Sequence, residues 1–473
     1  MRGLTVLVAA TILSLAACRT IETELPPVEL PETSVQSLPD VERWWTQFND
    51  PQLNALIEEA FAANLDLRVA MARIEEARAN MGVARSFLYP TLDAYANADR
   101  TRRSNATDLS FPGPQISNFY GVGLQASYEV DLSGRVAAGV SAADSTLLAT
   151  RYNTEAVRTV LAAQVTTTYF TLLALDAELQ ISRDTLVTRE DAVGLQRQRY
   201  DAGLISEYDL KLAQAERASV AASVPPLQRA RAQTEAALAS LVGRSARAVF
   251  TPVIARAGLV QAAIVPEVPV GLPSDVLVRR PDIRQSEAQL AAANARVAEA
   301  RAQYFPSLLL TGFYGSESSD LSNLFSGPAV IWSIAGRLLQ PIFTGGRISA
   351  QVDGAKARQQ QLELQYVQTV QSAFRDAHDA LVAHSSARDS FIAQSERRAL
   401  FAQALALAEL RYRSGYVSYI DVLDTQRNLL EAERQRVLAL RERQVALVDL
   451  YKAIGGGWSP EAFAQASSPP PAR

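Results

Sequence analysis

The sequence predicts a mainly α-helical chain of two tandem repeats, each with a helix, two strands, a very long helix and a return helix. Three observations support this prediction. A short motif occurs at 199–210 and again at 411–422, with its Arg, Tyr, Gly, Ser and Asp in register 212 positions apart. A stretch of 66 residues without proline leads into each copy, at 135–200 and 347–412. From Tyr120, thirteen residues alternate between apolar and small or polar side chains, which is typical of a strand with two unlike faces.

The N-terminus predicts an exported lipoprotein. Arg2 and a short apolar core at 4–13 form the pattern of a signal peptide over residues 1–17, and the core is too short to span a bilayer as a helix. The sequence Leu-Ala-Ala-Cys that follows resembles a bacterial lipobox, so we expect lipidation of Cys18, the only cysteine. In resembling proteins an Asp after this cysteine retains the protein at the inner membrane, whereas Arg19 stands here and favours the outer membrane. The alternative is an ordinary signal peptide with an incidental cysteine.

Composition divides the chain into six segments. Prolines gather after the signal, between the repeats and at the end of the chain, where extended or disordered structure is expected. The predicted segments are a signal peptide at 1–17, a lipidated tether at 18–42, a first repeat at 43–247 with strands at about 90–132 and a hairpin tip at about 200–209, a proline-rich strap at 248–273, a second repeat at 274–458 with strands at about 306–342 and a tip at about 412–421, and a disordered tail at 459–473.

The strand pairs predict part of a membrane β-barrel. Leu92, Ala94 and Ala96 alternate with polar residues opposite the strand from Tyr120, and 308–314 and 332–338 repeat the pattern. Each strand has about the 9–11 residues of a tilted membrane-spanning strand. Two half-buried hairpins in a soluble sandwich are the alternative. Four strands cannot close a barrel, and an open edge in lipid leaves backbone groups without partners, so two, three or four chains would have to share one barrel.

The long helices predict αα-hairpins. A 66-residue helix would extend about 100 Å and needs another helix along its length. Gly203 and Gly415 are expected to end the incoming helices in the left-handed conformation, and a Ser three residues later to cap the return helix. Pro225 and Pro226 predict a break in the first return helix only.

The sequence contains no catalytic motif, P-loop or dinucleotide fingerprint. Its net charge of −4 provides no basic field for nucleic acid, and its two histidines lie six residues apart, on different helix faces. We therefore expect no cofactor, metal site or catalytic residue. The remaining candidates are Asp421 and Asp424, which share one face of a return helix, and Asp209, which matches Asp421 in the first repeat. The alternative is a solvated helix start, where acids favour the positive end of the helix dipole.

Several motifs resemble the TolC-like outer-membrane efflux proteins, and specifically the lipoprotein branch that serves resistance–nodulation–division (RND) pumps. The resemblance extends from about Trp44 to Trp458 and rests on the two tip motifs and on the segments 279–283, 304–307, 341–343 and 450–458. It implies a homotrimer with a shared twelve-stranded barrel in the outer membrane of a Gram-negative bacterium. A twelve-helix tunnel would continue from the barrel into the periplasm. The implied partners are a periplasmic adaptor protein, an inner-membrane RND pump and the outer-membrane lipid.

The resemblance also assigns roles by position. Asp421 and Asp424 would form stacked acidic rings at a periplasmic gate, and Tyr412 with Asp209 would match a tether between neighbouring coils. Val417 stands where the family's well-studied member has an Arg, so a tether built on that Arg is not expected. The adaptor-contact tips would be Gly203, Leu204, Gly415 and Tyr416.

The leading interpretation is therefore a passive exit duct in a tripartite efflux system, gated at its periplasmic tips. A non-channel periplasmic lipoprotein that uses coiled coils as a spacer explains the helices and Cys18 but not four amphipathic strands. A periplasmic enzyme is disfavoured because no nucleophile, base or metal cluster is visible. The cargo stays open among drugs, metal cations and lipids.

Overall fold

The computed structural model describes residues 25–27, 42–104, 114–256, 258, 279–459 and 463. The signal peptide, Cys18 and most of the tether, strap and tail lie outside this part of the chain. The chain forms two compact units. One unit contains Arg73–Arg151 and Gln285–Val367, and the other contains Val28–Ala72, Tyr152–Arg284 and Gln368–Arg473.

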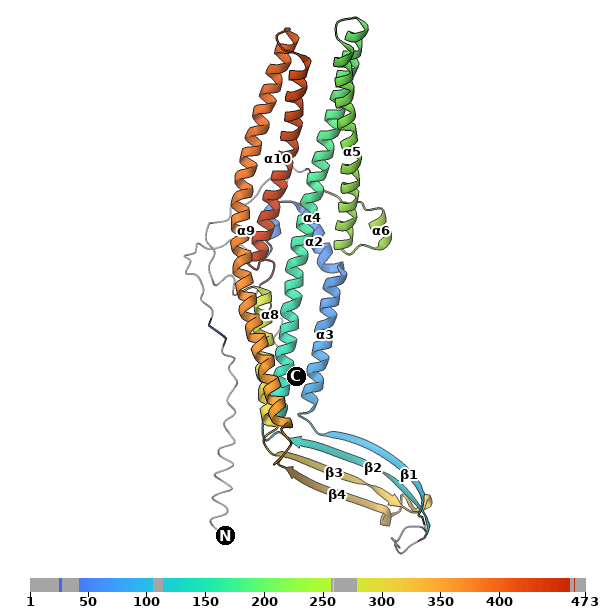
Figure 1. Ribbon diagram of the computed structural model, residues 1–473. Coiled ribbons are helices and arrows are strands. Elements are labelled where there is room, and N and C mark those ends of the chain that lie inside the picture. Colours follow the sequence, from blue (N-terminus) through green and yellow to red (C-terminus); the bar gives the residue numbers. More distant parts are fainter. Residues whose placement is uncertain are drawn as a thin grey trace. The chain divides into compact units, whose positions relative to one another are not determined.

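The order of elements repeats, as predicted (Figure 1). The two longest helices have 67 residues each and the two return helices 35 each. The main elements are η1 (Trp44–Phe48), α2 (Pro51–Ala63), α3 (Leu65–Ser86), β1 (Thr91–Arg102), β2 (Ile116–Val130), α4 (Arg135–Asp201), α5 (Glu207–Leu241), α6 (Ala246–Phe250), α8 (Pro281–Ala302), β3 (Ser307–Ser318), β4 (Val330–Leu339), α9 (Arg347–Arg413) and α10 (Tyr419–Ala453), with short 3-10 turns η3 (Leu321–Asn323) and η4 (Gly327–Ala329) before β4.

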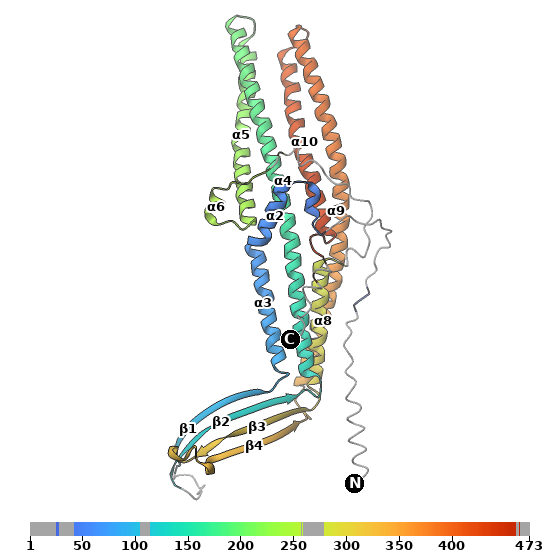
Figure 2. The ribbon, with the colours of Figure 1, turned by 180° about the vertical axis from the view of Figure 1, so that it is seen from behind.

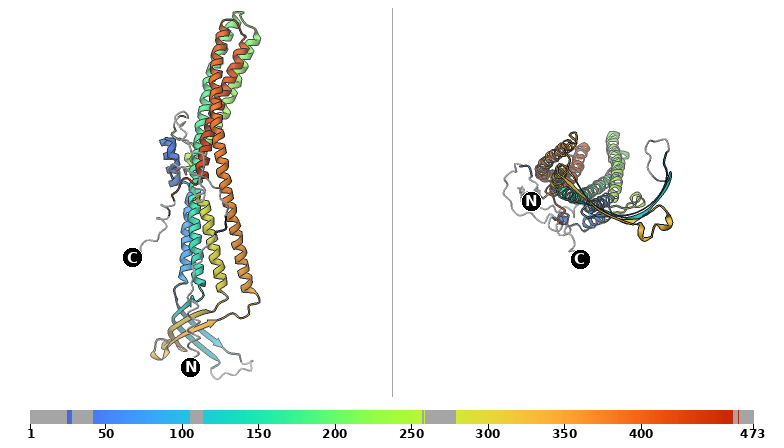
Figure 3. Two further views of the ribbon diagram at one scale, coloured as in Figure 1. Left: turned by 90° about the vertical axis from the view of Figure 1, so that its left-hand side faces the viewer. Right: turned by 90° about the horizontal axis from the view of Figure 1, so that it is seen from below.

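In the first unit the four strands form one antiparallel sheet in the order β1-β2-β3-β4, and the sheet is curved (Figures 1 and 3). The register places apolar residues opposite one another across all four strands. Ala94 pairs with Leu124, Leu124 with Tyr314, and Tyr314 with Trp332. Over these rows one face of the sheet is apolar, with Tyr314 and Trp332 exposed in the single chain, whereas Arg100 and Arg102 lie on the same face at the far end of β1.

Exposed aromatic residues also gather where the sheet joins the helices. Before β1, before β3 and after β4, which meet at the same end of the sheet, lie Phe87, Tyr89, Tyr304, Phe305 and Phe343, all exposed. An apolar sheet face with a band of aromatic residues at its end is the pattern of a strand region that faces lipid.

In the second unit, α4 with α5 and α9 with α10 form two long antiparallel hairpins (Figures 1 and 2). Both tips are built as predicted. Gly203 has a φ of 72° and Gly415 a φ of 76°, the left-handed conformation that ends a helix at low cost only in glycine. Ser206 and Ser418 are the N-caps of the return helices.

The predicted break at Pro225 and Pro226 is wrong, because α5 runs through both prolines. Each proline removes one intrahelical hydrogen bond. Both rings are exposed, so water can solvate the carbonyl groups that lose their partners, and the helix continues on both sides of the pair.

The core of this unit forms where the chain around η1 packs against the hairpins. Trp44, Trp45 and Phe48 are buried, and the Trp44 ring stacks on Tyr451 with 5.5 Å between centroids. Burial raises the pKa of Tyr451 to about 12, so its hydroxyl remains protonated and donates to Gln47. Among the described helices, α4 alone contains a stretch apolar enough to cross a membrane, and 56% of that stretch is buried in the fold.

The first α-helix of the core, α2, is capped by Asp50. The Asp50 side chain accepts hydrogen bonds from the backbone N–H groups of Gln52 and Leu53, with Pro51 at the first helical position. The same carboxylate accepts a 2.6 Å bond from the Tyr169 hydroxyl of α4. One side chain therefore both starts α2 and fixes it to the long helix.

The two repeats also close their return helices at equivalent positions. Asn64 donates to the carbonyl of Leu241 at the end of α5 (2.8 Å), and Arg280 donates to the carbonyl of Ala453 at the end of α10 (3.1 Å). Asn64 and Arg280 are 216 positions apart and the two carbonyl residues 212 apart, which are the two displacements of the repeat. Asn64 directly precedes α3 and Arg280 directly precedes α8, so the end of each return helix is joined to the start of an earlier helix of the same repeat.

Candidate functional site

The hairpin tips expose the residues that the sequence predicts as contacts. Leu204 and Tyr416 follow the two tip glycines and are 74% and 79% exposed. Apart from the neighbouring residues in the chain, no atom of the described residues lies within 4 Å of the position that a Cβ would take at Gly203 or Gly415. Both tips are therefore free surfaces in the single chain.

Asp209 and Asp421 have a structural role that the sequence analysis did not assign. Asp421 accepts hydrogen bonds from the backbone N–H of Ser418 (2.9 Å) and from its hydroxyl (2.6 Å). Asp209 accepts the same pair from Ser206. These are capping boxes, in which cap and third residue satisfy each other. The bonds from Ser418 lower the pKa of Asp421, so this exposed carboxylate is ionised at neutral pH.

Asp424 lies one helical turn beyond Asp421, on the same face of α10. Its carboxylate is exposed and receives Arg427 Nη1 at 3.3 Å. The two acids can therefore act as neighbouring negative charges in solvent, one held by a cap and one by an arginine.

Tyr412 connects the two hairpins, although through other residues than predicted. Its hydroxyl accepts a 2.7 Å bond from Arg199 and a 3.4 Å bond from Gln196, both on α4. The Arg199 guanidinium also lies 5.5 Å from the centre of the Tyr412 ring. In the described part of the chain, no hydrogen bond joins Tyr412 to Asp209, so a tether between those two residues stays a prediction.

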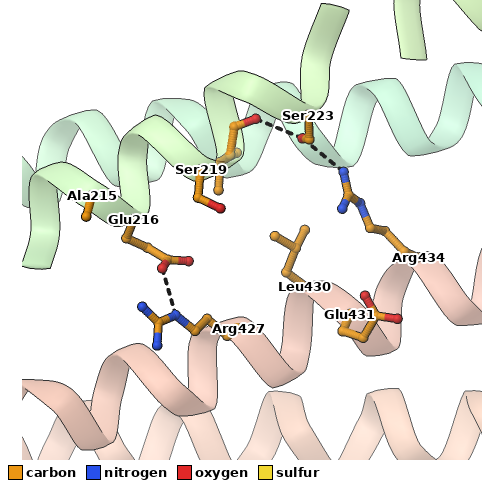
Figure 4. A pocket seen from close by; sticks show the side chains of 9 residues that line it. Ala215, Glu216, Ser219, Ser223, Arg427, Leu430, Glu431 and Arg434 are labelled. Carbon is orange, nitrogen blue, oxygen red and sulfur yellow. Dashed lines mark hydrogen bonds and ion pairs between the residues drawn. The ribbon is translucent and has the colours of Figure 1, made fainter. Parts of the chain in front are cut away.

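Farther from the tips, a set of polar contacts continues between the hairpins, and we call this set the seam. Glu216 of α5 accepts a 2.7 Å bond from Arg427 of α10 (Figure 4). Arg189 of α4 donates to Gln426 of α10. Arg434 of α10 donates to two serines of the first hairpin, Ser182 and Ser223.

The seam contains a buried cation, Arg189, and a buried carboxylate, Glu216. Arg189 is 3% exposed, and its burial lowers its pKa. The Glu216 side chain is 7% exposed, whereas that of Arg427 is 48% exposed. Among the groups that act on Arg189, Glu216 is the carboxylate and Arg427 is a second cation. Glu216 therefore attracts both guanidinium groups, and its loss would leave the buried Arg189 with the repulsion of Arg427.

A groove of about 530 Å³ lies over the seam between α5 and α10. Figure 4 shows Glu216 and Ser223 on one wall and Arg427 and Arg434 on the other. Within the described residues, no group of three or more His, Cys, Asp or Glu side chains could hold a metal ion. The polar contacts of the seam join the two hairpins.

Comparison with known proteins identifies the family. The model of the outer membrane efflux protein family matches residues 56–244 and 272–456, which are the two repeats. The chain belongs to the outer membrane efflux protein family. The two long hairpins and the four-stranded sheet agree with this family. Membership assigns the chain to the efflux channels of the outer membrane.

Relatives from several bacteria cover almost the whole chain. The solvent efflux pump outer membrane protein SrpC of Pseudomonas putida is 36% identical over 87% of this chain and 87% of its own. The probable outer membrane lipoprotein SilC of Salmonella typhimurium is 33% identical over 95% of this chain and 98% of its own. The crystal structure of the open state of the MtrE outer membrane channel of Neisseria gonorrhoeae superposes with a TM-score of 0.78, at 34% identity over 92% of this chain and 98% of that one.

Proposed function

We propose that three copies of this chain form an exit duct through the outer membrane. The duct would receive cargo from an inner-membrane RND pump through a periplasmic adaptor. The observation that carries the proposal is the sheet, which has an exposed apolar face and, among the described residues, no strand paired to the outer edges of β1 and β4. In lipid, every unpaired backbone group costs several kcal/mol, so these edges need partners.

Copies of this chain can supply those partners. All three pairings are antiparallel, so β4 of one copy can join β1 of the next in the same antiparallel pattern and close a barrel. On α9, Val382, Ile392, Leu400, Leu407 and Leu410 are exposed in the single chain, which supports helix packing between copies as well. The number three comes from the family resemblance. A coiled-coil spacer would not explain the apolar sheet face.

The gate would lie at the hairpin tips. There Asp421 and Asp424 of three copies would form acidic rings, and Gly203, Leu204, Gly415 and Tyr416 would meet the hairpins of the adaptor. Opening would separate the hairpins along the seam. The MtrE structure is named for its open state, which supports two states for this chain too.

The test of the gate is Asp424→Asn in the purified protein in planar bilayers. We expect the cation preference of single channels to fall by roughly twofold or more, because a ring of carboxylates concentrates cations at a constriction. Asp424 is the better choice than Asp421, whose replacement would also disturb a helix cap.

Asp449→Asn is the matched control. Asp449 lies on the same helix, has a half-exposed side chain and pairs with a cation three residues on, Lys452, as Asp424 pairs with Arg427. We expect it to leave conductance and selectivity unchanged. Identical traces for Asp424→Asn and wild type, or equal effects of both substitutions, would reject the gate assignment.

The lipid anchor gives a second prediction. We expect Cys18→Ala to abolish incorporation of labelled palmitate in cells, because the thioether forms on this side chain alone. The name of SilC as a probable lipoprotein supports the assignment. Wild-type protein labelled in the same cells is the control, and label retained by the variant would contradict the prediction.

A further inference from the structure

Three aromatic residues lie on the polar face of the sheet, Tyr95, Phe119 and Phe313, and the rings of two of them are in contact. Tyr95 of β1 and Phe313 of β3 have ring centroids 5.4 Å apart and planes inclined by 35°. They meet across β2, because Tyr95 pairs with Gly123, which in turn pairs with Gly315. The polar face would be the lumen of the duct, so a role for these rings in transport rests on the proposed function.

The Phe313 ring covers the backbones of Gly123 and Gly315. A Cβ added to Gly123 or to Gly315 would come within 2.9 Å of a carbon of that ring. The ring therefore lies flat across both backbones, and a side chain at either position would displace it. The aromatic surface therefore stays close to the sheet and does not project into the lumen.

The same face is acidic around the rings. Of the strand residues on this face, all of them in the described part of the chain, four are acidic and one is basic. We count only the cross-strand rows whose side chains point to this face. Asp93 lies in the row of Phe313, and Glu317 and Asp99 lie one and two rows beyond Tyr95. Glu129 is neutralised by Arg135 at 2.7 Å. The one cation, Arg337, lies beside Leu309, two rows from Phe313 and on the side of the pair away from Glu317.

We propose that Tyr95, Phe313 and Glu317 form a transit site for flat aromatic cations, one in each copy, on the lumen wall of the barrel. Ring faces attract cations and stack with flat aromatic molecules, and the nearby carboxylates oppose anions. The site gives the exit duct a preference of its own, added to whatever the pump selects.

The experiment measures the block of single-channel current by ethidium, a flat aromatic cation, in wild-type trimers in planar bilayers. In the variant Tyr95→Leu with Phe313→Leu we expect half-block to need about tenfold more ethidium, because stacking and cation–π attraction are both lost. Glu317→Gln is expected to need about threefold more. Leucine keeps an apolar cover over the glycines, which protects the strand pairing.

The matched control is Tyr314→Leu, which removes a ring from the next position of β3 on the opposite face. We expect ethidium block in this variant to equal the wild type, and the anionic dye fluorescein to block neither. Equal ethidium block in the double variant and the wild type would overturn the inference, even if the variant trimers melt earlier. That result would mean that the rings only cover the glycines.

Two further outcomes separate this inference from the proposed function. A wild-type channel that ethidium does not block, or that fluorescein blocks as well, would overturn the transit site alone. If the wild-type protein forms no channel in the bilayer, the proposed function fails and the transit site fails with it.

Discussion

Glu216→Gln is expected to open a leak in the resting duct. Glu216 is the buried carboxylate that accepts from Arg427 and attracts the buried Arg189, which Arg427 repels. Removing one partner of a fully buried ion pair costs about 3–5 kcal/mol. Since Arg427 is half exposed, we expect about 1–3 kcal/mol here, which corresponds to roughly a tenfold to hundredfold shift toward separated hairpins. The measurement is the uptake of a large antibiotic that the outer membrane normally excludes, in cells that express the variant.

Glu190→Gln is the matched control for this leak. Glu190 also accepts from an arginine, Arg217, at 3.2 Å, but both side chains are about half exposed and the pair joins α4 to α5 within one hairpin. Exposed pairs contribute about 1 kcal/mol or less, so we expect the antibiotic uptake of the wild type. A leak of the same size in both variants, or in neither, would show that the seam does not hold the resting state.

The repeat and the hairpins could be predicted from the sequence because their signals are local. A proline-free stretch, a glycine and a serine three residues later predict both tips, and the alternation from Tyr120 predicts β2. The register of the sheet could not be predicted, because the pairing of Leu92 with Ala126 depends on how 103–115 connect the two strands. Pro225 and Pro226 misled the prediction because a helix with exposed prolines can continue where solvent satisfies the freed carbonyl groups.

The site was predictable only in part. The spacing of Ser206 to Asp209, and of Ser418 to Asp421, is a capping-box pattern, so the sequence contained the signal for the caps. The seam left no such signal. Glu216 and Arg427 lie in different repeats, and their contact depends on which faces of α5 and α10 meet. The contact of Arg199 with Tyr412 likewise joins residues of different hairpins, which no local pattern predicts.

Trp44→Ala is expected to cause the largest loss of stability. The Trp44 side chain is fully buried, stacks on Tyr451 and contacts Trp45 and Phe48 edge-on. Replacing a buried tryptophan by alanine costs about 3–5 kcal/mol, against about 5–15 kcal/mol for a typical protein. The change would also release η1 and α2 from the hairpins that they hold. We expect the thermal unfolding temperature, followed by helical circular dichroism of the purified protein in detergent, to fall by several degrees.

Two variants define the origin of this loss. Phe250→Ala removes a ring that is 90% exposed and should leave the unfolding temperature unchanged. Trp44→Phe keeps an aromatic ring against Tyr451 and should lose less than Trp44→Ala, since part of the stacking and burial survives. If Trp44→Ala unfolds at the wild-type temperature, the segment around η1 does not stabilise the hairpins. If Trp44→Phe is as unstable as Trp44→Ala, the stack on Tyr451 is not the source of the stability.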